Sequence, residues 1–62
     1  MKFSEFLKVI GGEIVLVHLG NINNIECEAD KNAIRSYRED LLDREITLVG
    51  IKGKNTFEVL LK

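Results

Sequence analysis

Residues 45–61 read EITLVGIKGKNTFEVLL, and this stretch decides the fold. Two runs rich in β-branched and apolar residues, 45–51 and 56–61, flank the polar segment 52–55, which has the composition of a hairpin loop. The register that we expect pairs Ile51 with Thr56, Gly50 with Phe57, Leu48 with Val59 and Ile46 with Leu61. We therefore predict two antiparallel strands joined by a four-residue loop, with the Phe57 ring covering Gly50.

A second strand pair precedes this hairpin. Residues 13–19 (EIVLVHL) are apolar on both alternating faces, as in a central strand, whereas residues 25–30 (IECEAD) alternate apolar and acidic side chains. Residues 20–24 supply the turn, because glycine and asparagine tolerate positive φ. The expected register pairs Leu19 with Ile25, Val17 with Cys27 and Val15 with Ala29, which sets His18 opposite Glu26.

Two further segments have helical character. Residues Phe3, Phe6, Leu7 and Ile10 follow the spacing of one helix face, so we predict a helix over about 3–10 that Gly11 and Gly12 close in the left-handed conformation. Residues 31–43 leave two alternatives open. Either a helix runs over about 32–42 with Ile34, Tyr37 and Leu41 on its inner face, or the preceding strand continues to Ile34 and only residues 37–42 form a short turn of helix.

The order of these elements predicts an α+β fold with one domain over residues 1–62. It has a short N-terminal helix, a small antiparallel four-stranded sheet, and a short helix between the second and third strands. The chain is 45% hydrophobic and 31% charged, which is typical of a globular domain. No apolar run approaches the roughly 18 residues of a membrane span, and the N-terminus lacks the pattern of a signal peptide. With its single cysteine, Cys27, the chain suits a reducing compartment, so we expect a cytoplasmic protein with no membrane partner.

The size of the chain limits how it can be stabilised. A domain of this size buries only about 60% of the surface that its unfolded chain exposes, and usually needs a disulfide, a metal or a partner. One cysteine and one histidine, His18, cannot form an intrachain disulfide or a structural zinc site. We therefore expect no metal and no cofactor, and either a compact core or self-association.

One face of the expected sheet has no obvious cover. The registers above place on it the apolar residues Ile14, Leu16, Val49, Ile51 and Leu60. Either the segment 32–42 closes this face, or the face is an apolar patch that awaits a partner. Because two-fold dimers are the commonest oligomers, we predict a homo-oligomer, with a dimer favoured and these residues as its interface.

The titratable residues do not form a catalytic set. His18 could act as a general base oriented by Glu26, and Cys27 could act as a nucleophile, but no serine, second histidine or second thiol accompanies them. A strand histidine bonded to a carboxylate and a buried, inert thiol are the ordinary interpretations. We therefore expect that the protein is not an enzyme.

Two groups of charged residues are candidate binding sites. Glu26, Glu28 and Asp30 could bind a basic protein partner, although such a face also discourages edge-to-edge pairing of strands. Arg35, Arg38, Lys52 and Lys54 of adjacent subunits could instead clamp the phosphates of a nucleotide, although loop lysines commonly serve solubility. The net charge of −1 argues against sequence-specific nucleic-acid binding.

Two segments, MKFSEFL at 1–7 and EDLLDREI at 39–46, resemble a pattern found in small uncharacterised proteins of phages and prophages of Gram-positive bacteria. The resemblance extends to the order of elements, but the usual proline just before Leu41-Leu42-Asp43 is missing. It implies no catalytic residue. It implies a phage accessory protein, a class that includes inhibitors of host defence and of host enzymes.

From this resemblance we expect a non-enzymatic accessory protein that inhibits a host protein, such as a defence factor, by binding its surface. Its location would be the cytoplasm of an infected or lysogenic bacterium. Two alternatives remain open: an oligomeric sponge for a signalling nucleotide, and a structural or regulatory interaction module.

Overall fold

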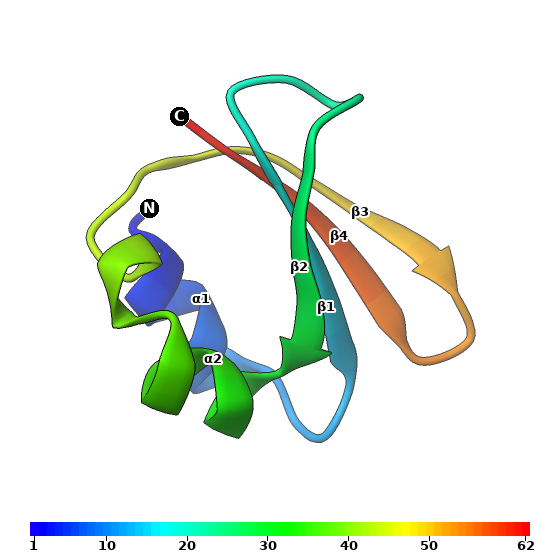
Figure 1. Ribbon diagram of the computed structural model, residues 1–62. Coiled ribbons are helices and arrows are strands. Elements are labelled where there is room, and N and C mark those ends of the chain that lie inside the picture. Colours follow the sequence, from blue (N-terminus) through cyan, green and yellow to red (C-terminus); the bar gives the residue numbers. More distant parts are fainter.

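The computed structural model describes residues 1–62, with two α-helices, one 3₁₀ helix and four strands. In chain order they are α1 (Phe3–Val9), β1 (Ile14–Leu19), β2 (Ile25–Asp30), α2 (Lys31–Tyr37), η1 (Glu39–Leu41), β3 (Ile46–Gly53) and β4 (Thr56–Leu61). The helices form one layer and the sheet forms the other (Figure 1). The α+β class, the N-terminal helix and the helix between the second and third strands are therefore confirmed.

The sheet has the order β2-β1-β4-β3, and it is mixed rather than wholly antiparallel. The two hairpins are antiparallel, but the central strands β1 and β4 run parallel to each other. The expectation of an antiparallel sheet was wrong for this central pair. The reason is the connection after β2: β2 and β3 lie at opposite edges and point the same way, so α2 and η1 must cross one face of the sheet between them.

The register of the first hairpin is partly as expected. Val15 pairs with Ala29 and Val17 with Cys27. An irregularity between Val17 and His18 then sets His18 opposite Ile25, so the predicted pairing of His18 with Glu26 was wrong. A β-bulge adds one unpaired residue to a strand, and this shifts every later pair by one position.

The second hairpin pairs Ile46 with Leu61 as expected, but its remaining pairs differ from the prediction. Leu48 pairs with Leu60, Val49 with Val59, Gly50 with Glu58 and Ile51 with Phe57. Register shifts after Ile46 and after Ile51 are responsible, and the strands extend to a two-residue loop, Lys54-Asn55, instead of the predicted four-residue loop. The Phe57 ring does not cover Gly50. It packs edge-on against Phe6, with the ring centroids 5.5 Å apart.

Helix α1 supplies one side of the core, as its sequence spacing predicts. Phe3, Phe6, Leu7 and Ile10 are all at most 8% exposed. The helix ends because Ile10 adopts an extended conformation and not because a glycine turns left-handed; the only residue with positive φ is Gly20 in the first hairpin turn. Side chains of α2 satisfy carbonyls at this end, with Lys31 donating to the Ile10 oxygen and Arg35 to the Leu7 oxygen.

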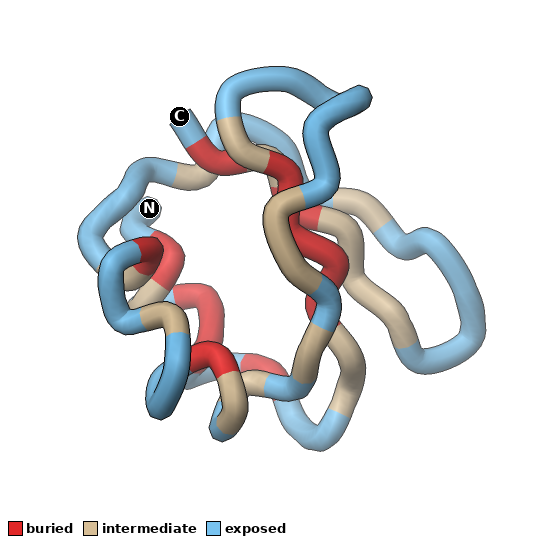
Figure 2. Tube along the Cα trace, viewed as in Figure 1, coloured by how far each residue is buried: buried red, intermediate tan, exposed pale blue.

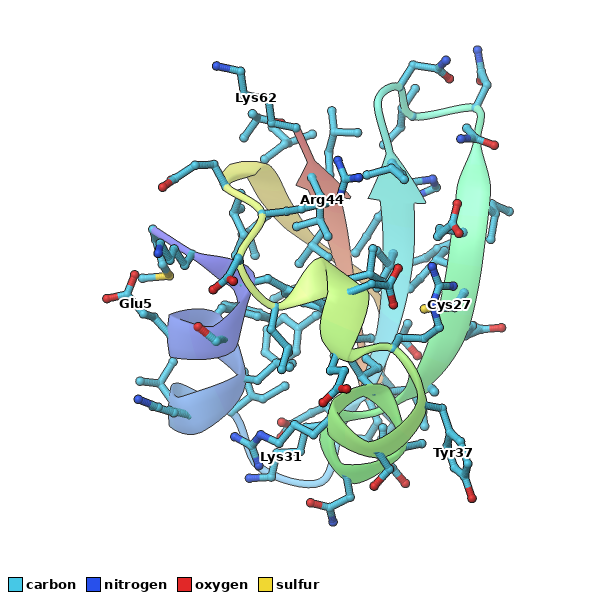
Figure 3. The ribbon with its side chains drawn as sticks, turned by 60° about the vertical axis from the view of Figure 1, so that its left-hand side comes forward. Glu5, Cys27, Lys31, Tyr37, Arg44 and Lys62 are labelled. Carbon is cyan, nitrogen blue, oxygen red and sulfur yellow. The ribbon has the colours of Figure 1, made fainter.

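The segment 31–43 combines features of the two alternatives. It begins as a helix, as the first alternative expects, but α2 stops at Tyr37 and Arg38 leaves the helical conformation before η1 begins. This break returns Leu41 to the core beside Ile34, while Tyr37 is 83% exposed and points into solvent (Figure 3). The prediction that Tyr37 faces inward was wrong.

Both parts of this segment lie on the same side of the sheet as α1, because Ile34 and Leu41 share one core cluster with Phe3 and Leu7. Buried residues therefore follow α1 and the central strands, whereas the tip of the second hairpin is exposed (Figure 2). No helix covers the opposite face of the sheet.

Candidate functional site

The uncovered side of the sheet, which we call the helix-free face, is built from three rows of residues that run across the four strands. The registers place in these rows, from β2 to β3, Asp30-Ile14-Thr56-Gly53, Glu28-Leu16-Glu58-Gly50 and Ile25-His18-Leu60-Leu48. The rows contain three carboxylates and no lysine or arginine. Leu16 lies between Glu28 and Glu58, one on each neighbouring strand, so an apolar centre is flanked by two acids.

The predicted oligomer interface does not lie on one surface. Ile14, Leu16 and Leu60 belong to the helix-free face, as expected. Val49 and Ile51 pair with Val59 and Phe57, whose side chains point toward the helices, so their expected place on the helix-free face was wrong. The one-residue change of register in the second hairpin is the cause, because it moves a strand's side chains to the opposite face.

Leu16 is 4% exposed, so it offers a partner little surface, whereas Ile25 and Leu48 at the two ends of the third row are 61% and 55% exposed. Contact with a partner at the helix-free face would therefore involve mainly the outer apolar residues of this row.

His18 is the one buried polar residue, with 3% of its surface exposed. Its Nε2 lies 2.7 Å from Oε2 of Glu58, a residue of the parallel neighbour β4. An ionised carboxylate only accepts hydrogen bonds, so Nε2 donates to it. Nδ1 is buried and has no hydrogen-bond partner. The interpretation as a strand histidine bonded to a carboxylate holds, but the carboxylate is Glu58 and not Glu26.

The three acids of β2 have three different environments. Glu26 accepts a hydrogen bond from Arg38 at 2.8 Å, and Asp30 caps α2 by accepting from the Ala33 N–H. Glu28 is exposed on the helix-free face. The candidate acidic site of Glu26, Glu28 and Asp30 is therefore not one free stripe, and Glu58 from β4 is the acid that lies in the same row as Glu28.

Arg38 joins β2 to the segment before η1. Its guanidinium also donates two hydrogen bonds to Asp40, at 3.0 and 3.1 Å. The hydrogen bonds to Asp40 and to Glu26 raise the pKa of Arg38, and the hydrogen bond from Arg38 holds the pKa of Asp40 below its ordinary value. The network joins distant segments and does not follow from the sequence, in which the only local signal is the spacing of Arg38 and Asp40.

The four candidate phosphate-binding residues are separated within one chain. Arg38 is bound to two carboxylates, and Arg35 donates to a backbone carbonyl of α1. Lys52 and Lys54 lie at the far end of the second hairpin. There Lys54 lines a shallow pocket of about 170 Å³ with Asn55, Thr56 and Phe57, but the carboxylate of Glu13 shares that pocket and disfavours an anion.

Cys27 lies on β2 opposite Val17 and is half-buried (Figure 3). Burial raises the pKa of the Cys27 thiol, while the positive charge of Arg38 acts in the opposite direction. A raised pKa lowers the fraction of reactive thiolate near neutral pH. The structure thus gives this residue the environment of an unreactive thiol, as its place in the strand pattern suggested.

No family model, curated protein or solved structure matches the chain. None of its helices has the length and apolar character needed to cross a membrane. The candidate site is a helix-free, acidic and partly apolar sheet face with a part-buried His18–Glu58 pair.

Proposed function

We propose that the protein acts by binding another protein through the helix-free face, and not by catalysis. The observation that supports this best is the row Ile25-His18-Leu60-Leu48 on a face that no helix covers, because its end residues Ile25 and Leu48 are 61% and 55% exposed. Glu28 is exposed in the neighbouring row. Apolar surface that stays exposed in a monomer commonly marks an interaction site.

The charge of this face indicates the chemistry of the partner. Its rows contain no lysine or arginine. Of their acids, Glu28 is exposed, Glu58 is bonded to His18, and Asp30 caps α2. A complementary surface would combine lysine or arginine side chains with apolar groups that contact Ile25 and Leu48, since complementary potentials speed association and disfavour wrong partners. In the setting that the phage resemblance implies, the partner is a host protein, such as a defence factor, that has a basic surface. Binding of the present protein to that surface would inhibit the host protein.

A comparison of variants in a binding assay tests this proposal. Tagged wild-type protein is used to capture partners from host lysate, and each captured protein is then purified and titrated with Ile25→Lys, Glu28→Lys and the control Glu39→Lys. Glu39 is exposed in the helix layer, so its variant changes the charge equally but away from the helix-free face.

We expect both face variants to weaken binding by about tenfold or more and the control to bind as the wild type does. We also expect rising salt to weaken the wild-type complex. Equal binding by all four proteins, or no partner that survives purification, would contradict the proposal.

A further inference from the structure

Strand β3 is the edge of the sheet that carries the most exposed apolar surface. Leu48, Val49 and Ile51 are 55%, 45% and 79% exposed, and no charged residue lies between positions 46 and 51. The opposite edge, β2, carries the acids Glu26, Glu28 and Asp30, a common protection against pairing with other chains. The two edges therefore differ, and only β3 lacks such charges along its centre.

The N-terminal residues define how much of the β3 edge is free. The Ile46 N–H donates to the Met1 carbonyl at 2.9 Å, and Lys2 forms a β-bridge with Glu45. The edge is thus occupied as far as Ile46, and the free stretch runs from Thr47 to Gly53. Gly50 is the midpoint of that stretch.

Gly50 has no packing reason within one chain. A Cβ added there would meet no atom within 4 Å, so the monomer has room for a side chain. Glycine inside a strand often marks a place where another backbone approaches closely.

The two ends of β3 carry opposite charges, with acidic side chains before the strand and lysines at its far end. Asp43 and Glu45 precede the strand, and Lys52 and Lys54 lie at its other end. The Glu45 carboxylate lies 3.1 Å from the N-terminal ammonium and the Asp43 carboxylate 4.0 Å from the Lys2 ammonium, but their side chains stay 54% and 94% exposed. Antiparallel pairing of two copies would bring the acidic end of each beside the basic end of the other. Parallel pairing would place like charges together. Arg44, between the two acids, is directed to the carbonyl of Lys62 (Figure 3).

We propose that a second copy of this chain pairs with β3 in antiparallel fashion about a two-fold axis at Gly50. Val49 of each copy then lies opposite Ile51 of the other, and Leu48 opposite Lys52. The two sheets become one sheet of eight strands with both helix layers on the same side, and the two helix-free faces become continuous. This dimer does not depend on what the helix-free face binds.

The register shifts after Ile46 and after Ile51 leave only residues 48–51 in regular pairing with β4. The contact between copies is therefore short, and small interfaces give weak, transient association. We expect a reversible monomer–dimer equilibrium at micromolar or higher concentrations and not a permanent dimer.

Sedimentation and light scattering up to about 1 mM protein test the dimer, as weak interfaces require high concentration. The average mass is expected to rise with concentration from 7.0 kDa toward twice that value. Ile51→Lys should raise the dissociation constant at least about tenfold, because it replaces apolar contacts in both copies. Ile25→Lys, an exposed apolar residue changed in the same way on the other edge, should have no effect. Circular dichroism and melting confirm that both variants fold.

Charge-reversal variants, first alone and then mixed, test the pairing of opposite end charges that the antiparallel direction brings about. The double variants Asp43→Lys/Glu45→Lys and Lys52→Glu/Lys54→Glu each have like charges at both ends of β3, so each alone should dimerise less than the wild type. Mixed together, they should form a heterodimer. A monomeric wild type at the highest concentration, equal loss of dimer in Ile51→Lys and Ile25→Lys, or no association in the mixture would overturn the proposal.

Discussion

His18 and Glu58, which are forty residues apart in the chain, are joined by a 2.7 Å hydrogen bond on the helix-free face. The bond exists because β1 and β4 are parallel neighbours, with His18 paired to Leu60 and Leu16 paired to Glu58. It satisfies Nε2 of a residue that is 3% exposed, while Nδ1 has no partner. The energetic consequences of this bond can be measured.

Glu58→Ala should lower the free energy of unfolding by about 1–3 kcal/mol, since it leaves both ring nitrogens of a buried histidine unsatisfied. Glu28→Ala, which removes the other acid of the same row, should change it by less than about 0.5 kcal/mol. The double variant His18→Leu/Glu58→Leu should be close to wild type, because neither partner is left without the other. Urea unfolding measures all three, and equal losses for Glu58→Ala and Glu28→Ala would show that the bond contributes nothing.

The hydrogen bond from Arg38 to Asp40 should make stability depend on pH in the acid range. Because the pKa of Asp40 is lowered in the folded state, the stabilisation is present above the ordinary value of 3.8 and is lost as the pH falls through the lower folded value. Between pH 6 and pH 2, the melting temperature of the wild-type protein should therefore fall further than that of the Asp40→Asn variant. Asp43→Asn, at an exposed neighbouring carboxylate, is the control and should behave as the wild type does. If the melting temperature of Asp40→Asn fell at low pH by as much as that of the wild type, this prediction would be contradicted.

Cys27 should react slowly with thiol reagents in the folded protein. Burial raises the pKa of its thiol, and the thiolate is the reacting form. The rate of reaction with a disulfide reagent at pH 7.5 should be lower than that of the same chain unfolded in guanidinium. Arg38→Gln should slow the native reaction further, because the Arg38 charge acts to lower the Cys27 pKa. A faster reaction in Arg38→Gln than in the wild type would be the opposite of this expectation.

Leu7→Ala should be strongly destabilising because the Leu7 side chain is fully buried between α1 and the sheet. Truncating a buried leucine costs about 2–5 kcal/mol, which is comparable with the whole stability of a domain this small. Val9→Ala, at a residue of the same helix that is 75% exposed, should change stability by less than about 0.5 kcal/mol. Urea midpoints compare the two, and similar midpoints would show that α1 does not hold the core together.

The parts of the structure that sequence reasoning predicted are those with local causes. The stripe of Phe3, Phe6, Leu7 and Ile10 is buried because helical periodicity alone places these side chains on one face. The pairs Val15–Ala29 and Val17–Cys27 follow from a short turn between two alternating strands. Each of these predictions needs only residues that are close together in the chain.

The candidate site was predicted less well because it depends on contacts between distant segments. Pairing of β1 with β4 gave His18 a partner other than Glu26, and the bulges in the second hairpin separated Val49 and Ile51 from Leu16 and Leu60. A bulge changes the number of residues between two pairs without leaving a clear pattern in the sequence.

The sequence by itself determined the α+β class, the positions of its strands and the apolar side of α1, because hydrophobic periodicity and turn residues act over a few neighbouring positions. The tertiary structure alone decided that both helical segments cover the same face, that β1 and β4 are parallel, and that Glu58 is bonded to His18. Those features depend on which distant surfaces bury the most apolar area together, and that is a property of the whole packed chain.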